Sequence, residues 1–362
     1  MILIAPTAFK GTLSPSAAAR AIAAGIESSA SLDREVCLCP LADGGDGMIE
    51  SANLSIGGEV RSLSVQGPTG ETVQARWLEF NRGQHRIALV ELANACGIAY
   101  LSQEQLQPLN ASTYGLGEVI AACYHSGIRN IKIGIGGSAS TDGGMGALVA
   151  LGVQFFTASG DQVPPAGGAV LNRIERCSFD KLKLQNCVLE ILTDVENPLL
   201  GANGAAAVFA PQKGANPEEV AFLERSLAHF AEVLERTTGH QVRSQPGAGA
   251  AGGAGFGLAC GLGATIRSGF DWIAQTAHLD EKIQRSSLVI TGEGRFDSQS
   301  LSGKVIGSLS KKCSQLDRPL WVVAGSADLV GAESGVERVI VPPSKGGFCT
   351  DQDIKNAIAR SF

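Results

Sequence analysis

The chain lacks a surplus of basic residues. Its 29 lysines and arginines stand against 35 aspartates and glutamates, which gives a formal net charge of −6. A protein that binds nucleic acid needs a cationic surface, so this balance argues against that class of partner. Charged residues make up 18% and hydrophobic residues 44% of the sequence. That proportion excludes a disordered chain, because enough apolar surface is available to bury a core.

The sequence also lacks the cysteine pattern of a disulfide framework or a zinc site, since its nine cysteines are an odd number without a Cys-x-x-Cys pair. Residues 1–6 carry no basic region and too short an apolar run for a signal peptide. Residues 244–266 carry no charge, but they are dense in Gly and Ala, which supply little transfer energy for membrane insertion. These absences predict a soluble cytoplasmic protein without a membrane partner.

Two named nucleotide-binding motifs are missing. No Gly-x-x-x-x-Gly-Lys-Ser/Thr occurs, which excludes an ordinary P-loop. Residues 247–252 match Gly-x-Gly-x-x-Gly by letter, but they follow Pro246 and no clear strand. We therefore interpret them as a flexible or closely packed Gly/Ala turn rather than a dinucleotide fingerprint. Glycine is abundant elsewhere, with 46 residues in 362, which predicts many sharp turns or backbone that closely approaches something.

Alternating strands and helices mark both ends of the chain. Residues 2–5 form an apolar run, and Ser14-Pro15 is an N-cap followed by proline at the first helical position. The helix after it carries Ala18, Ile22 and Ile26 on one face. The last quarter returns to this order, with strands predicted at 288–291, 320–323 and 338–341.

The middle of the chain has a different pattern. Residues 60–65 and 72–80 flank a Gly-Pro-Thr-Gly turn, which indicates an antiparallel hairpin. Asn216-Pro217 with Glu219 forms a capping box that predicts the start of a long helix. We therefore predict an α/β protein in which residues 1–60 and 286–362 form one domain and residues 61–285 form a second, inserted domain.

Glycine and hydroxyl residues gather where a predicted strand at 131–135 ends. Ligands of parallel sheets bind beyond the carboxyl ends of strands. Glycines there turn backbone N–H groups toward an anion, and a following helix adds the positive end of its dipole. We predict a phosphate cradle with Asp142 near a metal; a tight turn that packs a helix against a sheet is the alternative. The residues predicted to contact the phosphate, which is that of the nucleotide if the chain is a kinase, are Gly136, Gly137, Ser138, Ser140, Gly143 and Gly144.

Several acids also lie in glycine-rich settings, at Asp43, Asp46, Asp142, Asp194, Glu293 and Asp297. A turn aspartate usually just caps backbone N–H groups, which is the default for each one alone. Five loops in mutual reach favour a shared site, where carboxylates could hold Mg²⁺ or accept a hydroxyl proton. Four cations could offset phosphate or carboxylate charge, although a lone surface lysine is normally solvated. They are Lys10, Lys213, Arg295 and Lys304.

These motifs resemble the bacterial glycerate kinase type 1 family. The resemblance rests on residues 6–14, 42–47, 134–144, 193–198, 210–215, 247–257 and 291–297, which occur in family order and span nearly the whole chain. It implies an ATP-dependent phosphotransferase with an alcohol acceptor, which requires Mg²⁺ and converts D-glycerate to 2-phosphoglycerate, or to 3-phosphoglycerate in some members. It also implies a flavodoxin-like parallel-sheet domain formed by both chain ends, a second mixed-sheet α/β domain inserted into it, and an active site in the cleft between them.

Roles for single residues are our hypotheses within that resemblance. We predict that Asp194 is the catalytic base or a metal ligand and that Asp142 is a second metal ligand. Asp43 helps orient glycerate or metal, and Lys10 contacts an anionic ligand. Glu293 and Arg295 are assigned to the nucleotide.

The sequence departs from the family's usual pattern in two places. Thr7-Ala8 replaces Asp-Ser, and Ser140-Thr141 replaces Thr-Asn. Two other functions stay open at this point. A dinucleotide-dependent oxidoreductase would need Gly-x-Gly-x-x-Gly directly after a strand. A non-enzymatic protein that binds a small metabolite would not need so many carboxylates.

Overall fold

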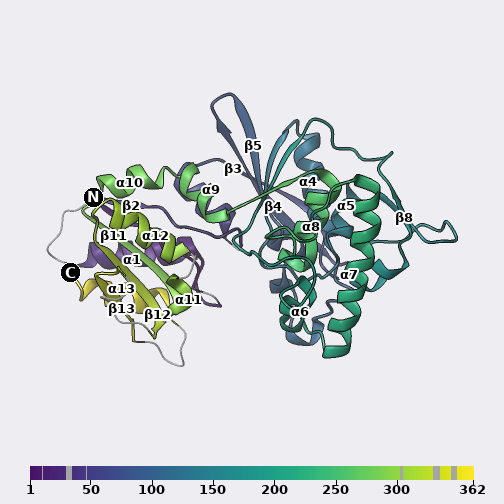
Figure 1. The fold of residues 1–362 in the computed structure, drawn as a ribbon. Helices are drawn as coiled ribbons and strands as arrows, with labels where there is room; N and C mark the ends of the chain where they lie inside the picture. Colours follow the sequence, from purple (N-terminus) through teal and green to yellow (C-terminus); the bar gives the residue numbers. More distant parts are fainter. Residues whose placement is uncertain (10, 30–34, 46, 302–304, 329–334, 344–348) are drawn as a thin grey trace. The chain divides into compact units, whose positions relative to one another are not determined.

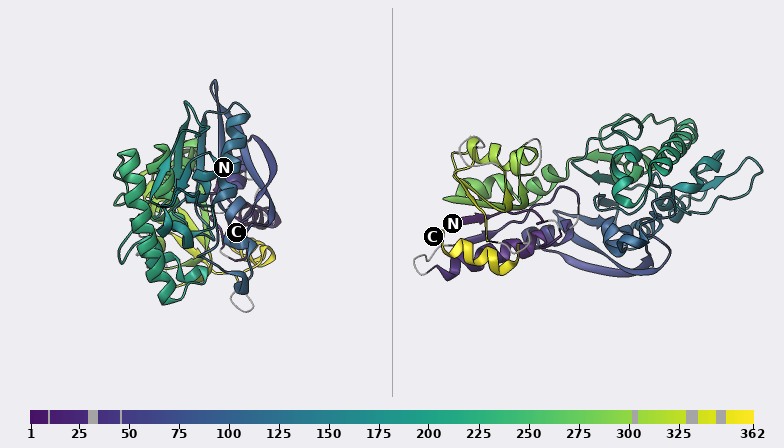
Figure 2. Two further views of the ribbon diagram at one scale, coloured as in Figure 1. Left: turned by 90° about the vertical axis from the view of Figure 1, so that its right-hand side faces the viewer. Right: turned by 90° about the horizontal axis from the view of Figure 1, so that it is seen from below.

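The computed structural model describes residues 1–9, 11–29, 35–45, 47–301, 305–328, 335–343 and 349–362 (Figure 1). The chain forms two compact units. Unit 1 consists of Met1–Gly57 and Gly269–Phe362, and unit 2 consists of Gly58–Ser268. Both chain ends therefore belong to unit 1, and Figure 2 shows both termini there.

Unit 1 contains a five-stranded parallel sheet. Its strands are β1 (Ile2–Ile4), β2 (Val36–Leu38), β11 (Leu288–Phe296), β12 (Leu320–Ala327) and β13 (Arg338–Ile340). They lie in the order β13-β12-β11-β1-β2. Numbered within this unit, the order is 2-1-3-4-5, which is that of flavodoxin. The predicted fold class of this domain is confirmed.

The helices of unit 1 are α1 (Pro15–Ser28), α2 (Met48–Ile56), α9 (Gly269–Thr276), α10 (Leu279–Arg285), α11 (Ser298–Leu301), α12 (Val305–Gln315) and α13 (Asp351–Ala359). Helix α1 begins as predicted, because the Ser14 side chain accepts a hydrogen bond from the N–H of Ala17 and Pro15 is the first helical residue. Helices α1 and α13 pack closely, since a Cβ on Gly25 would lie 2.6 Å from Ile358 Cβ. Their buried isoleucines form one core cluster with Ile2 and Ile4 of β1.

Two sequence predictions for unit 1 need correction. Strand β11 does not end at residue 291, because Glu293 and Arg295 continue the parallel register opposite Ala324 and Ser326 of β12. Both strands are therefore longer than predicted. Residues 269–285 belong to unit 1, although the predicted boundary at 286 assigned them to the inserted domain. Helix α9 starts against the second βα connection: a Cβ on Gly269 would lie 2.5 Å from the carbonyl carbon of Asp43.

Unit 2 contains a six-stranded mixed sheet in the order β10-β9-β6-β5-β4-β3. The strands are β3 (Glu59–Gln66), β4 (Thr72–Arg82), β5 (His85–Glu91), β6 (Asn130–Gly134), β9 (Val188–Leu192) and β10 (Thr265–Arg267). β3 and β4 pair antiparallel, as the hairpin pattern predicted. β5 also pairs antiparallel with β4, and β5, β6, β9 and β10 pair parallel. A separate two-stranded ribbon joins β7 (Gln154–Phe156) to β8 (Arg176–Ser178).

The helices of unit 2 pack on this sheet or on one another. The α-helices are α3 (Ala93–Cys96), α4 (Tyr114–His125), α5 (Met145–Ala150), α6 (Ala205–Phe209), α7 (Pro217–Thr238) and α8 (Ala250–Leu262). Short 3₁₀ turns are η1 (Ile98–Tyr100), η2 (Gln103–Gln105), η3 (Gly168–Arg173) and η4 (Pro211–Lys213). Figure 1 shows α7 as a long helix, and it packs against α6 and α8. Its predicted capping box is present, with Asn216 and Glu219 bonded reciprocally.

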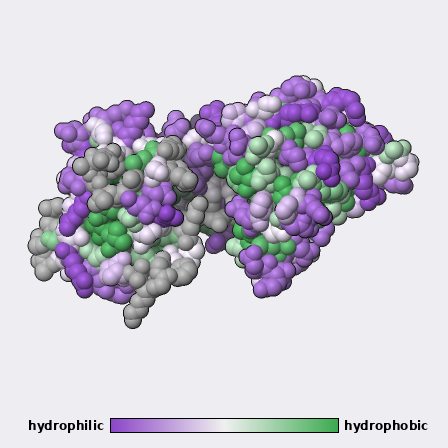
Figure 3. All heavy atoms as spheres, turned by 60° about the horizontal axis from the view of Figure 1, so that its bottom comes forward, coloured by the Kyte–Doolittle hydropathy of each residue, from purple (hydrophilic) through white to green (hydrophobic). Residues whose placement is uncertain are grey.

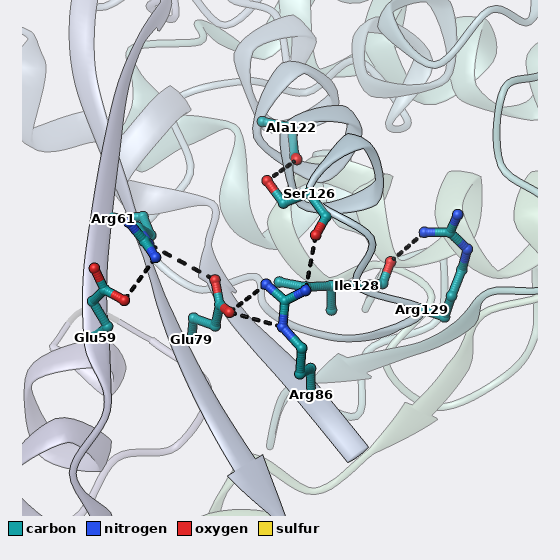
Figure 4. Close-up of polar contacts among 8 residues, drawn as sticks. All are labelled: Glu59, Arg61, Glu79, Arg86, Ala122, Ser126, Ile128 and Arg129. Atoms are coloured by element: carbon teal, nitrogen blue, oxygen red, sulfur yellow. Dashed lines mark hydrogen bonds and ion pairs between the residues drawn. The ribbon is translucent and has the colours of Figure 1, made fainter. Parts of the chain in front are cut away.

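A charged cluster fixes the antiparallel part of this sheet to α4 (Figure 4). Arg86 of β5 donates from Nε to Glu79 of β4 at 2.9 Å. It also donates to the carbonyl of Ser126, just after α4, at 3.0 Å. Arg61 of β3 reaches Glu59 at 2.7 Å and Glu79 at 3.8 Å. The two arginines and Glu59 are exposed, whereas the Glu79 side chain is 14% exposed, so Glu79 is the least accessible member of the cluster and both arginines contact it.

The described surface is mostly polar. On the face drawn in Figure 3, hydrophilic residues predominate and apolar side chains form smaller groups. Within the described residues, none of the helices has the length and hydropathy that a membrane span requires. The charge-free residues 244–266 instead hold α8, most of whose side chains are buried inside unit 2.

Candidate active site

The predicted loop and the predicted base of unit 2 lie at one edge of its sheet. β6 and β9 are parallel neighbours in which Gly134 lies opposite Leu192. The glycine-rich loop, residues 136–144, starts two residues after Gly134, and Asp194 lies two residues after Leu192. Because parallel neighbours end at the same edge, the structure brings the start of the loop and Asp194 together.

Only the beginning of the glycine-rich loop is accessible. Gly137 is exposed and has a φ of 72°, and Gly136 is half-buried. The described residues accept no hydrogen bond from the N–H groups of Gly136, Gly137 or Ser138. Consecutive N–H groups with this freedom are suited to an anion.

The second half of the loop is bonded to the protein itself. The N–H of Gly143 donates to Gly252 of α8 at 3.0 Å, and the N–H of Gly144 donates to Asp142 Oδ1 at 3.2 Å. Ser140 is completely buried. The nucleotide contacts predicted for Ser140, Gly143 and Gly144 stay predictions. The contacts described for them are those of the alternative, a tight turn that packs a helix against a sheet.

Helix α8 approaches this loop through glycine. Gly252 has a φ of 64°, and a Cβ there would lie 2.2 Å from the carbonyl oxygen of Ser140. Ala251 and Gly253 also have positive φ angles, so the helix starts with an irregular turn. The Gly-x-Gly-x-x-Gly letters at 247–252 therefore belong to a closely packed Gly/Ala turn, one of the two forms expected from the sequence.

Asp142 anchors the loop. Its side chain is completely buried, and Oδ2 accepts hydrogen bonds from the N–H and hydroxyl of Thr113 at 2.8 and 2.7 Å and from the N–H of Gly146 at 3.2 Å. These bonds tie the start of α4 to the start of α5. Among the described residues, no three His, Cys, Asp or Glu side chains lie together in a group that could hold a metal. The metal contact predicted for Asp142 stays a prediction.

Lys213 lies beneath the loop rather than in solvent. It is 3% exposed, and its Nζ donates to Ser138 Oγ at 2.8 Å and to the Ser140 carbonyl at 2.5 Å. Burial lowers the pKa of Lys213 to about 7, while the charge of Asp142 acts in the opposite direction. The sequence predicts Lys213 only as one of four cations that could offset anionic charge. Its neighbours in the sequence, Gln212 and Gly214, do not indicate this burial.

Glu91 is a buried acid that the sequence analysis missed. It ends β5 directly opposite Gly134, is 4% exposed, and accepts a hydrogen bond from the side chain of Asn94. The segment after it covers the loop, since Ile98 donates its N–H to the Gly137 carbonyl at 2.8 Å. Glu91 directly follows the apolar run 87–90, and this position at a strand end is the sequence pattern that indicates it.

Asp194 has a well-fixed backbone and a half-buried side chain that makes contacts of its own. Thr193 before it donates its N–H to the Arg267 carbonyl of β10 at 3.0 Å and accepts from the N–H of Val195 at 3.2 Å. A carboxylate at such a strand end is held rigidly, as a catalytic or metal-binding group requires.

The other predicted site residues lie in unit 1. Asp43 is exposed, and its Oδ1 accepts a hydrogen bond from the N–H of Gly45 at 3.1 Å, which is the turn-capping alternative. Glu293 is half-buried on β11. Arg295 is exposed and pairs with Asp328 at 2.6 Å. Lys10, Asp46 and Lys304 lie outside the described residues.

Thr7, which replaces the aspartate of the family's usual pattern, has a structural role at the end of β1. The N–H and hydroxyl of Thr7 donate to the carbonyl of Gly292 at 2.8 and 3.0 Å. β1 and β11 are the strands at which a flavodoxin-like sheet reverses its direction of winding, and ligands of such folds bind there. Thr7 thus joins the two strands at the edge where the predicted loop residues of unit 1 begin.

The chain combines a flavodoxin-like domain with a mixed-sheet insertion, and it carries a glycine-rich loop and acids at strand ends. This combination is typical of an α/β enzyme that acts on a small molecule. The sequence model of the glycerate kinase family matches residues 2–340. The chain belongs to this family, as the motifs predicted, and is a phosphotransferase with an alcohol group as acceptor. Family membership sets aside the oxidoreductase and the non-enzymatic binding protein.

Curated relatives and a solved structure agree with this assignment. The chain is 40% identical to glycerate 2-kinase of Escherichia coli K12 over 343 residues, which cover 93% of this chain and 89% of the relative. It is 39% identical to glycerate kinase of Bacillus subtilis 168, with 90% and 85% covered. A crystal structure from Salmonella typhimurium LT2, provisionally named glycerate kinase 2, superposes with a TM-score of 0.84 at 34% identity and covers 99% and 95% of the two chains.

Proposed function

We propose that this kinase transfers a phosphoryl group from ATP to D-glycerate, with Mg²⁺, and forms 2-phosphoglycerate. The observation that carries the proposal is the edge of the unit 2 sheet, where the accessible start of the glycine-rich loop and Asp194 follow neighbouring parallel strands. The relative named glycerate 2-kinase, at 40% identity over 93% of this chain, supports the choice of product.

Phosphoryl transfer asks the protein mainly for positioning and for relief of negative charge. The N–H groups of Gly136, Gly137 and Ser138 are suited to a phosphate of the nucleotide, since the described residues leave them without an acceptor. We assign Asp194 one of two roles: it accepts the proton that the glycerate hydroxyl loses, or it is a ligand of Mg²⁺.

A magnesium ion fits this donor set, because Mg²⁺ in kinases is bound through one or two carboxylates together with substrate phosphates. Asp194 is the residue of this edge that would hold it, and the ion would neutralise phosphate charge. The roles proposed for Asp43, Lys10, Glu293 and Arg295, and a site between the two domains, stay predictions. The cytoplasmic location also stays a prediction.

A coupled assay of ADP release tests the function and the base together. We expect ADP release that requires both D-glycerate and Mg²⁺. Asp194→Asn keeps the size of the side chain but loses its charge, so we expect kcat to fall by about 10²–10⁴ with little change in melting temperature. Asp161→Asn, on an exposed turn of the same unit, is the matched control and should keep the wild-type rate.

Three outcomes of this assay are informative. A near-normal kcat for Asp194→Asn at saturating Mg²⁺ and substrates shows that the catalytic assignment is wrong. Recovery of the rate with extra Mg²⁺ makes Asp194 a metal ligand rather than the base. Absence of ADP release from the wild-type protein with D-glycerate, together with tight binding of another metabolite, refutes the proposed function itself.

A further inference from the structure

Among the described residues, one buried lysine contacts the glycine-rich loop, and it lies far from the loop in the sequence. Lys213 ends η4, 75 residues beyond Ser138, and its Nζ meets the Ser138 hydroxyl and the Ser140 carbonyl. A lysine normally keeps its ammonium in water. Here the side chain is 3% exposed, so the two hydrogen bonds must offset the free-energy cost of removing the amine from water.

The contacts of Lys213 fix the middle of the loop from one side while another segment holds it from the other. Ser138 and Ser140 flank Ala139, whose N–H donates to the Cys96 carbonyl at 3.0 Å. Residues 138–140 are thus bonded to η4 and to α3 at once. The residues before them, Gly136 and Gly137, have no such bonds through their N–H groups. The loop therefore divides into a fixed half and an available half, and Lys213 lies at the division.

Lys213 also lies too deep to touch a ligand directly. The Ser138 side chain separates it from the accessible residues, since Ser138 is 6% exposed and accepts from Nζ. Asp142, whose charge influences Lys213, is occupied by Thr113, Gly144 and Gly146. Lys213 therefore acts on the accessible residues only through its hydrogen bonds to Ser138 and Ser140.

We propose that Lys213 is a positioning residue of the kinase: its Nζ holds residues 138–140 so that the N–H groups of Gly136, Gly137 and Ser138 stay available to a phosphate of the nucleoside triphosphate. The identity of that anion rests on the proposed function. The role differs from the direct contact with an anion that the sequence suggested.

Lys213→Met tests this, because methionine has a similar length and fits a buried position but donates no hydrogen bond. Lys183→Met is the matched control, since Lys183 is an exposed lysine of the same unit. Amide hydrogen exchange at Ala139, whose N–H is bonded to the Cys96 carbonyl, is the first readout. Lys213 holds the residues on both sides of Ala139, so the loss of its two hydrogen bonds should let this amide open more often. We expect its exchange to accelerate about tenfold to hundredfold in Lys213→Met and to stay unchanged in the control.

Kinetics give a readout that general destabilisation would not produce. We expect Lys213→Met to raise the KM for ATP at least tenfold and to leave the KM for D-glycerate within about twofold. Ser138→Ala, which removes one acceptor of Nζ, should raise the KM for ATP by a smaller factor in the same direction. This second variant decides the question if Lys213→Met does not fold.

Unchanged exchange and an unchanged KM for ATP in folded Lys213→Met overturn the proposal. A rise confined to the KM for glycerate also overturns it. If the wild-type protein phosphorylates no glycerate, the proposed function fails, and the Kd for ATP measured by calorimetry on the same variants still decides the role of Lys213. An equal Kd in wild type and Lys213→Met then counts against it, and a weakened one supports it.

Discussion

The buried amine of Lys213 should make the stability of unit 2 depend on pH in an unusual direction. Burial lowers the pKa of Lys213 to about 7 in the folded protein, whereas an exposed lysine has a pKa of about 10.4. Between these values the unfolded chain binds one more proton than the folded chain. The free energy of unfolding therefore rises with pH across this window and becomes independent of this group below about pH 7.

The size of the effect follows from the two pKa values. One pKa unit corresponds to about 1.4 kcal/mol. Integrated from pH 7.5 to pH 9.5, the single group should add about 2–3 kcal/mol to the free energy of unfolding. Lys213→Met has no such proton, so the difference in stability between wild type and variant should increase by that amount over the same range. Other titrating groups cancel in the difference.

Urea unfolding followed by tryptophan fluorescence can measure this in unit 2 alone. The chain has three tryptophans, and Trp77 lies in the unit 2 core whereas Trp272 and Trp321 belong to unit 1. Replacing the latter two by Phe in every protein leaves Trp77 as the reporter. Lys183→Met should show a stability difference from wild type that does not vary with pH. If the Lys213→Met difference is equally flat from pH 7.5 to 9.5, the argument from burial is wrong.

Three further substitutions test other contacts. Gly252→Ala should destabilise the protein by about 2 kcal/mol or more in thermal unfolding and lower its activity. The reason is that Gly252 has a φ of 64° and that a Cβ there would lie 2.2 Å from the Ser140 carbonyl oxygen. An unchanged melting temperature would contradict the packing described. Asp142→Asn should cost about 1–3 kcal/mol of stability, because buried donors lose a charged acceptor, and excess Mg²⁺ should not restore its activity, as it would for a metal ligand. For Glu235, burial raises the pKa but hydrogen bonds from Arg243 and Val242 outweigh it and lower the pKa. The charged form therefore stabilises the protein above the ordinary Glu range, and this contribution is lost as pH falls below that range; a Glu235→Gln variant with the same acid denaturation curve as wild type would refute it.

Local patterns in the sequence identified the elements that depend on neighbouring residues. The hairpin of β3 and β4 and the capping box of α7 follow from alternation and from capping chemistry, and both are present. The extension of β11 to Phe296 depends on pairing with β12, which residues 292–296 do not reveal because they are rich in glycine and charge. The helix at 250–262 was missed for a similar reason, since its glycines are favourable only against the backbone of residues 140–144.

In the candidate site, too, some features follow from neighbouring residues and others depend on distant contacts. The place of Asp194 at a strand end follows from an apolar run that stops at an acid, and the neighbouring position of the glycine-rich loop follows from parallel pairing. The burial of Lys213 does not follow from its own surroundings in sequence. It depends on a contact across 75 residues, and from sequence alone this lysine resembles any loop lysine. Asp142 is similar, because its partner Thr113 lies 29 residues away.

A phosphorus NMR spectrum of the reaction products tests the central claim most directly. The protein is incubated with ATP, Mg²⁺ and D-glycerate, and the spectrum is compared with those of authentic 2- and 3-phosphoglycerate. We predict that one phosphomonoester resonance, that of 2-phosphoglycerate, grows in proportion to ADP. A resonance of 3-phosphoglycerate would contradict the proposed position of transfer. A spectrum with unchanged ATP, or with ADP and inorganic phosphate alone, would contradict the proposal that glycerate is the acceptor.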